Sequence, residues 1–165
     1  MKQLRLSVQL GAVALIATTG LLSLLHPRIA TAGEEQIERR NGAAYLTTTT
    51  DSTGAFVSRQ VIALHADHTM TTTASNSGGP TSHFTTELGS WKSDGDDRLV
   101  GKTIDFDLYP NEDVARLDYS MTVQDNGTSI SGIVELTIFP LQDNPFDGGG
   151  TVISTFPFTG VLIRP

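Results

Sequence analysis

Short runs of residues with high β-propensity, separated by turn residues, recur along the chain and constrain its fold more than any other feature. The runs are rich in Thr, Val, Ile, Phe and Tyr, and the segments between them contain Gly, Asn, Asp and Pro. This alternation predicts strands joined by tight turns, with no helix of useful length. The eight predicted strands are residues 43–50, 55–65, 69–75, 83–92, 98–109, 114–124, 129–140 and 151–163.

The spacing of apolar side chains predicts which face of each strand is buried. A period of two with one apolar face indicates an antiparallel sheet that is solvated on its other side. Consecutive hairpins predict a meander, and eight such strands usually close into a barrel, which removes the exposed edges. The predicted fold is therefore an all-β, eight-stranded, antiparallel up-and-down barrel, with a two-sheet β-sandwich as the alternative. The predicted inward faces are Ala115, Leu117, Tyr119, Met121 and Val123; Ile130, Val134, Leu136 and Ile138; and Val100, Ile104, Phe106 and Leu108.

The first 32 residues have the pattern of a secretory signal peptide. Lys2 and Arg5 precede the mostly apolar run 6–25, and Ala30-Thr31-Ala32 forms a small-x-small cleavage site. We therefore expect cleavage after Ala32 and a secreted or periplasmic protein. An uncleaved anchor is the alternative, because a membrane-spanning helix needs about 20 apolar residues. Polar residues dilute this run, however, which favours cleavage.

The rest of the chain is expected to form one domain. Residues 33–42 are polar and charged, so we predict a flexible N-terminal tail. Residues 43–165 then form a single barrel, because a chain of this size buries roughly two-thirds of its unfolded surface, enough for one core. No segment after the leader is apolar enough to predict a membrane span.

Composition excludes several classes of function. The chain contains no cysteine, which removes disulfides, thiolate metal sites and a catalytic cysteine. Without residues 1–32 it carries eight basic and 18 acidic residues, a formal charge near −10. Such a surface repels nucleic acid, because phosphate binding needs clustered Lys and Arg. We expect no nucleic-acid partner and no cofactor, and the oligomeric state stays open.

Three segments resemble a group of small bacterial calycin-like (lipocalin-like) β-barrel proteins. Residues 64–69 are similar to the pattern His-x-Asp-Gly-Thr, residues 87–96 to Gly-x-Trp-x-x-x-Gly-Asp, and residues 104–108 to the strand that follows. The resemblance spans about residues 45–139 and implies a barrel, without implying a particular activity. One departure is His68, which stands where the pattern has glycine.

The clusters of metal-ligand residue types are weak, and we expect no metal site. His65, Asp67 and His68 lie in a predicted turn that points side chains into water, with His83 the only further histidine within reach. The acidic turn 94–97 lacks the longer spacing and terminal Glu of a calcium loop.

Charged residues on the strands allow two interpretations. Asp105, Asp107, Arg116, Asp118 and Glu135 lie opposite the apolar faces, so we expect them on the outside of the barrel. If the register of a strand were inverted, its charges would line the interior and become general acid–base candidates.

Binding of a small molecule inside the barrel is the leading functional hypothesis. An eight-stranded barrel has room either for its own side chains or for one small ligand. Trp91 is expected to plug one end of the barrel or to line a ligand pocket. The alternatives are a cofactor-free isomerase, cyclase or hydrolase that uses the same cavity, and an envelope protein with a filled core. The pocket candidates for a small apolar or amphipathic ligand are Trp91, Phe106, Tyr119, Met121, Leu136, Phe156 and Phe158.

Overall fold

The computed structural model describes residues 32–39, 42–78, 83–107 and 112–164. The expected signal sequence lies almost entirely outside these residues, and so does Leu108. The described part contains one α-helix, one 3₁₀ turn and eight strands. They are α1 (Ala32–Arg39), β1 (Ala43–Thr50), β2 (Phe56–Leu64), β3 (Thr69–Ala74), β4 (Glu87–Ser93), β5 (Arg98–Asp107), β6 (Asp113–Gln124), η1 (Asp125–Gly127), β7 (Ser129–Pro140) and β8 (Thr151–Leu162).

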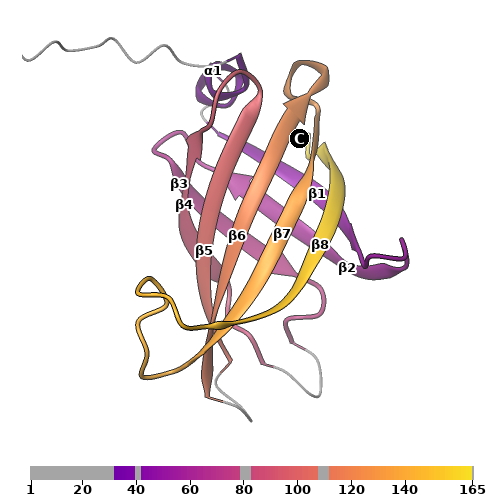
Figure 1. Cartoon of the computed structure of the whole chain (residues 1–165). Coiled ribbons are helices and arrows are strands. Elements are labelled where there is room, and N and C mark those ends of the chain that lie inside the picture. The colour runs from indigo at the N-terminus through magenta and orange to yellow at the C-terminus, as the bar shows by residue number, and fades with distance from the viewer. Residues whose placement is uncertain (1–31, 40–41, 79–82, 108–111, 165) are drawn as a thin grey trace, which may run out of the picture.

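The strands form a closed antiparallel barrel in which each pairs with its neighbours along the chain and β1 pairs with β8 (Figure 1). This confirms the predicted up-and-down barrel and excludes the sandwich. Closure leaves no sheet edge unpaired, so hydrogen bonds between strands satisfy the backbone all the way round. Among the described residues, no helix is long and apolar enough to cross a bilayer.

Helix α1 closes one end of the barrel, where the sequence predicted only a flexible tail (Figure 1). Ile37 is 1% exposed and belongs to the barrel core, and Glu34 is buried beside it. The peptide N–H of Gly42 donates to the carbonyl of Ile37 at 2.8 Å, which ends the helix directly before β1. Ile37 and Glu34 thus anchor this short polar segment on the barrel.

The predicted inward faces are correct for β6 and wrong for β5. Ala115, Tyr119 and Met121 are buried in the core, as the alternation of β6 predicts. In β5 the buried side chains are instead those at positions 99, 101, 103, 105 and 107. Phe106 points outward and is 43% exposed. Asp105 and Asp107 therefore lie inside the barrel, opposite to the expectation.

The segment 141–150 folds back across the outer face of β5, β6 and β7 (Figure 1). Arg116 donates from Nη1 to the carbonyl of Pro145 at 2.6 Å, and its guanidinium lies 5.1 Å from the ring centre of Phe139. Phe139 and Val114 are buried although they do not belong to the barrel core. They form a small second cluster under this segment.

Candidate functional site

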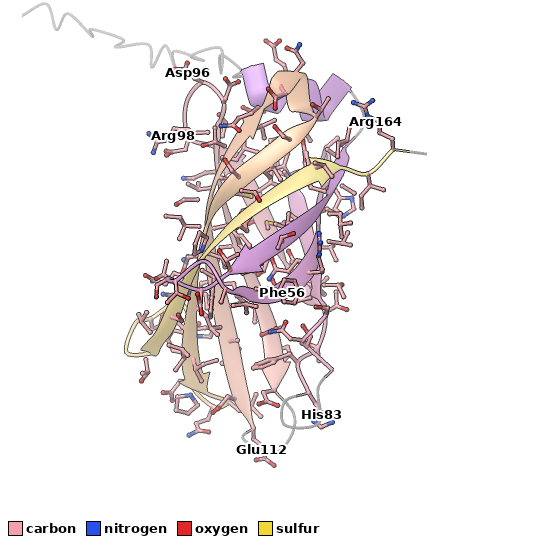
Figure 2. All side chains as sticks on the ribbon, turned by 90° about the vertical axis from the view of Figure 1, so that its right-hand side faces the viewer. Phe56, His83, Asp96, Arg98, Glu112 and Arg164 are labelled. Atoms are coloured by element: carbon pink, nitrogen blue, oxygen red, sulfur yellow. The ribbon has the colours of Figure 1, made fainter. Side chains whose placement is uncertain are left out.

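The barrel holds an interior cavity at the end opposite α1. Its volume is about 120 Å³, which is room for several water molecules or one small ligand. His83 and Glu112 mark this end of the molecule, and Asp96 and Arg164 mark the other (Figure 2).

The two walls of the cavity differ in chemistry. The lining from β6, β7 and β8 is entirely apolar, whereas most of the lining from the segments between β1 and β5 is polar, with Val57, Ala74 and Phe84 as its apolar members. The polar wall consists of Thr49, Ser58, Gln60, Asn76, Ser77, Glu87 and Asp105. The apolar wall consists of Ala115, Leu117, Val134, Leu136 and Phe156. A molecule with a polar and an apolar end fits this division.

Glu87 stands between the packed core and the cavity. Its side chain is 3% exposed and lines the cavity. Oε2 of Glu87 accepts hydrogen bonds from the phenol of Tyr119 at 2.7 Å and from the hydroxyl of Thr103 at 3.0 Å. Burial raises the pKa of Glu87, and the two hydrogen bonds oppose that rise because they favour the charged form.

Asp105 lines the same cavity from β5 and is 4% exposed. Burial raises its pKa to about 8, and the negative charges of Glu87 and Asp107 add to the effect. Its Oδ1 atom is buried without a hydrogen-bond partner anywhere in the described chain. At neutral pH this carboxyl group is therefore mostly protonated, and its Oδ1 atom is free to form a hydrogen bond with a water or a ligand.

Two further polar atoms on the same wall lack partners. Oε1 of Gln60 and Oγ1 of Thr49 are buried and make no hydrogen bond to any described residue. Both residues line the cavity, and their side chains are 7% and 2% exposed. Buried polar atoms normally find a partner in the protein, an ordered water or a ligand. Three such atoms therefore lie together on one wall of the cavity, where a water or a ligand could supply the missing hydrogen bonds.

Two of the seven predicted pocket residues, Leu136 and Phe156, line this cavity. Tyr119, Met121 and Phe158 are buried in the core instead, where the rings of Tyr119 and Phe158 meet edge to face at 6.2 Å. Phe106 lies outside the barrel, so it cannot contribute to an interior pocket.

Trp91 belongs to the α1 end, where it acts as a plug. It is 3% exposed, and its indole N–H donates to the carbonyl of His65 at 3.0 Å. Its ring lies 4.7 Å from that of His68, whose Nε2 is 3.8 Å from a carboxylate oxygen of Glu34. His68 has a φ of 67°, a conformation that glycine adopts easily. A glycine at this position would therefore adopt the same backbone without strain.

The other candidate clusters have local structural roles. Asp67 accepts hydrogen bonds from the backbone and hydroxyl of Thr69 at 3.0 and 2.6 Å, which fixes its turn. In the acidic turn 94–97, Asp94 pairs with Arg98 at 3.3 Å. Within the described ranges, no group of three or more His, Cys, Asp or Glu side chains is placed to hold a metal ion.

A second hollow lies outside the barrel on β4, β5 and β6, with a volume of about 400 Å³. Its lining includes Lys92, Lys102 and Asp118, and also Trp91 and Tyr119 of the predicted pocket residues. Asp118 contacts Lys102 at 2.8 Å and Arg116 at 2.7 Å. Glu135 pairs in register with Asp118 on this outer face, as predicted.

The polar wall of the cavity was not predicted from the sequence. Gln60 and Glu87 belong to no sequence motif, and Thr49 lies in one of the Thr-rich runs of high β-propensity. Asp105 was assigned to the outside. A usable signal was nevertheless present, because Arg98 and Lys102 share the face of β5 that was predicted to be buried. Two basic residues on one face indicate that the face is solvated.

The fold and the site together define a class: a closed, eight-stranded up-and-down β-barrel with an interior cavity, the architecture of calycin-like proteins. No family model, no curated protein and no solved structure matches the chain.

Proposed function

We propose that this protein is an exported, calycin-like barrel that binds one small amphipathic molecule in its interior. The observation that carries the proposal is the two-walled cavity, with three buried unpartnered polar atoms on one side and aliphatic and aromatic side chains on the other. The polar end of a ligand would supply hydrogen bonds to β1, β2 and β5. Its apolar end would pack against β6, β7 and β8.

The first experiment is mass spectrometry of a solvent extract from protein purified gently from its native host. We expect one low-molecular-weight compound in stoichiometric amount. The proposal would be contradicted if the extract of folded protein contained no such compound and no small amphipathic molecule raised the melting temperature in a thermal-shift screen.

A matched pair of variants locates the binding site. Ala115 lines the cavity, whereas Ala63 lies on the outer face of β2, so Ala115→Leu fills the cavity and Ala63→Leu does not. We expect only Ala115→Leu to lose the bound compound. Equal retention by both variants would place the ligand elsewhere.

Export is proposed on the pattern of residues 1–32. Determination of the N-terminus of the exported protein tests it, and the expected first residue is Gly33. An intact leader on the exported protein would contradict cleavage.

A second candidate function is general acid–base catalysis on a ligand in the same cavity. Asp105 favours it, because a carboxyl group with a pKa of about 8 can donate a proton at neutral pH. Glu87 on the neighbouring strand supplies a second carboxyl group. If the compound recovered from the host is converted by the protein, Asp105→Asn should abolish turnover even at a concentration of the compound that saturates the variant. Turnover that survives this substitution would remove Asp105 from the reaction.

A further inference from the structure

The polar wall of the cavity is rich in acceptors and acids. Oε1 of Gln60 can only accept hydrogen bonds, and the carboxyl groups of Glu87 and Asp105 become acceptors only when they are ionised. Glu87 and Asp105 line the cavity, and Asp107 is buried next along the same face of β5. Among the described residues that line the cavity, none is Lys, Arg or His.

The Lys and Arg residues closest in sequence to the lining residues are Arg59, Lys102 and Arg116, and they lie on the outer faces of β2, β5 and β6. Lys102 occupies an outward position of β5 and forms an ion pair with Asp118. Arg116 forms an ion pair with the same carboxylate. Of the titratable groups on the described strands, Glu87 and Asp105 line the cavity, Tyr119 contacts Glu87 from the core, and Asp107 is buried on the same face of β5 as Asp105. His83 is exposed at the mouth and meets Asp107 through its backbone N–H at 3.3 Å.

We propose that the ligand of this cavity is an organic cation, a protonated primary amine that carries a short apolar or aromatic group. This inference rests on the proposed binding function and names the chemical class of the ligand. An ammonium group has three donors, no acceptor and a positive charge. It therefore matches the unpartnered Oε1 of Gln60 and the buried carboxyl groups in their ionised form, and it can also donate to the hydroxyl oxygen of Thr49, which both accepts and donates. A neutral or anionic head group leaves acceptors or negative charges uncompensated.

The rest of the lining suits the remainder of such a molecule. Phe84 and Phe156 border the cavity, and aromatic ring faces attract cations. Leu136, Val134 and Leu117 supply aliphatic surface. The volume of about 120 Å³ restricts the ligand to a small amine rather than a long-chain one.

Binding of the cation should release a proton. In the empty cavity Asp105 holds its proton at neutral pH because of burial and of the two neighbouring acids. An ammonium group beside it favours the carboxylate, so the proton leaves Asp105 for the solvent buffer and an ion pair forms. No covalent bond to the ligand is made or broken.

The test is isothermal titration calorimetry of the purified protein at pH 7 with three probes of similar shape: 2-phenylethylamine, 2-phenylethanol and 3-phenylpropionate. We expect the amine to bind at least tenfold more tightly than the alcohol, with no binding of the acid. Titrations in buffers of different ionisation enthalpy should show release of up to one proton per amine bound. Asp105→Asn should weaken amine binding at least tenfold and abolish the proton release, whereas Asp118→Asn on the outer face should change neither.

Each contrary result has a defined meaning. If the alcohol binds as tightly as the amine, or the acid binds best, the inference of a cationic ligand is wrong while the binding function stands. If none of the three binds, the inference also fails, and the solvent extract from the native host decides the binding function separately. Unchanged amine affinity in Asp105→Asn would likewise overturn the assigned site.

Discussion

The phenol of Tyr119 donates a 2.7 Å hydrogen bond to Oε2 of Glu87 at the boundary between the packed core and the interior cavity. Tyr119 is 2% exposed and does not line the cavity, whereas Glu87 does. The hydrogen bond therefore connects a residue of the packed core, Tyr119, to a residue of the cavity lining, Glu87. Because Tyr119 is rigidly packed, it fixes the carboxyl group that it contacts.

Replacement of Tyr119 by Phe should lower stability in a pH-dependent way. The substitution removes one donor from a buried carboxyl group, a loss of about 1–3 kcal/mol in the free energy of unfolding. The cost should grow with pH, because the hydrogen bond favours the ionised form of Glu87 and opposes the rise of its pKa. Urea unfolding at pH 5 and pH 8 measures both effects.

Tyr45→Phe is the matched control for that experiment. Tyr45 is equally buried, and its phenol donates to the neutral carbonyl of Gly127 at 3.2 Å. Its loss should cost about 0.5–1.5 kcal/mol at either pH. If the two variants showed the same pH dependence, Tyr119 would not act through the charge of Glu87.

Asp105 should make the protein less stable as the pH rises from about 4 to 8. Its pKa in the folded state is about 8, above the ordinary value of 3.8. Between these values the folded protein holds a proton that the unfolded chain has lost, so the free energy of unfolding falls with increasing pH. One such group contributes a slope of at most about 1.4 kcal/mol per pH unit. Below pH 4 both states are protonated, and above pH 8 the penalty is constant.

Asp105→Asn should flatten this pH dependence and raise stability at pH 8 more than at pH 5. The amide has the shape of the carboxyl group and cannot ionise. Chemical denaturation of ligand-free protein at pH 5, 6.5 and 8 measures the change. Asp118→Asn is the control, since Asp118 lies outside and is paired with Lys102 and Arg116. A wild-type slope in Asp105→Asn would contradict the raised pKa.

The sequence predicted the architecture better than it predicted the site, for a physical reason. Strand positions follow from local turn chemistry, and all eight predicted strands correspond to observed ones. The inward face of a strand depends on how the whole barrel closes. In β5 the apolar residues Val100, Ile104 and Phe106 compete with the polar residues Thr103 and Asp105 for the interior, and alternation alone favoured the wrong set.

Cross-strand register corrects that error. Trp91 is buried, and it pairs with Gly101 across β4 and β5. Residues paired in register point to the same side of a sheet, so an inward Trp91 requires an inward Gly101 and, two residues on, an inward Thr103. The exposed positions of Arg98 and Lys102 follow from the same register. A polar wall inside the barrel thus breaks the apolar pattern on which sequence reasoning depends.

Helix α1 should be an integral part of the fold, in contrast to the tail that the sequence predicts. Ile37→Ala removes a side chain that is 1% exposed, which should lower the free energy of unfolding by about 2–4 kcal/mol. Trp91 is the only tryptophan and lies at the same end of the barrel, so its fluorescence reports the unfolding. Glu35→Ala, at an exposed position of the same helix, should cost less than about 1 kcal/mol. Equal stability of the two variants would mean that α1 does not pack on the barrel in solution.

Two inward-facing glycines on neighbouring strands should respond very differently to a methyl group. A Cβ at Gly89 would fall on the carbonyl oxygen of Lys102 and lie 2.7 Å from the Cα of Thr103, so β4 and β5 would have to separate. A Cβ at Gly101 would meet the sulfur of Met70 at 2.7 Å and the terminal methyl of Met121 at 3.2 Å. These are the far ends of flexible side chains, which can move aside at little cost.

We therefore expect Gly89→Ala to destabilise the protein by about 3 kcal/mol or more, and Gly101→Ala by about 1 kcal/mol or less. Thermal unfolding followed by circular dichroism compares the two variants. The result also bears on the resemblance, because Gly89 is the glycine of the Gly-x-Trp segment. A large loss in Gly89→Ala would explain that glycine by the close approach of two backbones, with no role in ligand binding. A loss in Gly89→Ala no larger than in Gly101→Ala would show that β4 and β5 are further apart than the structure places them.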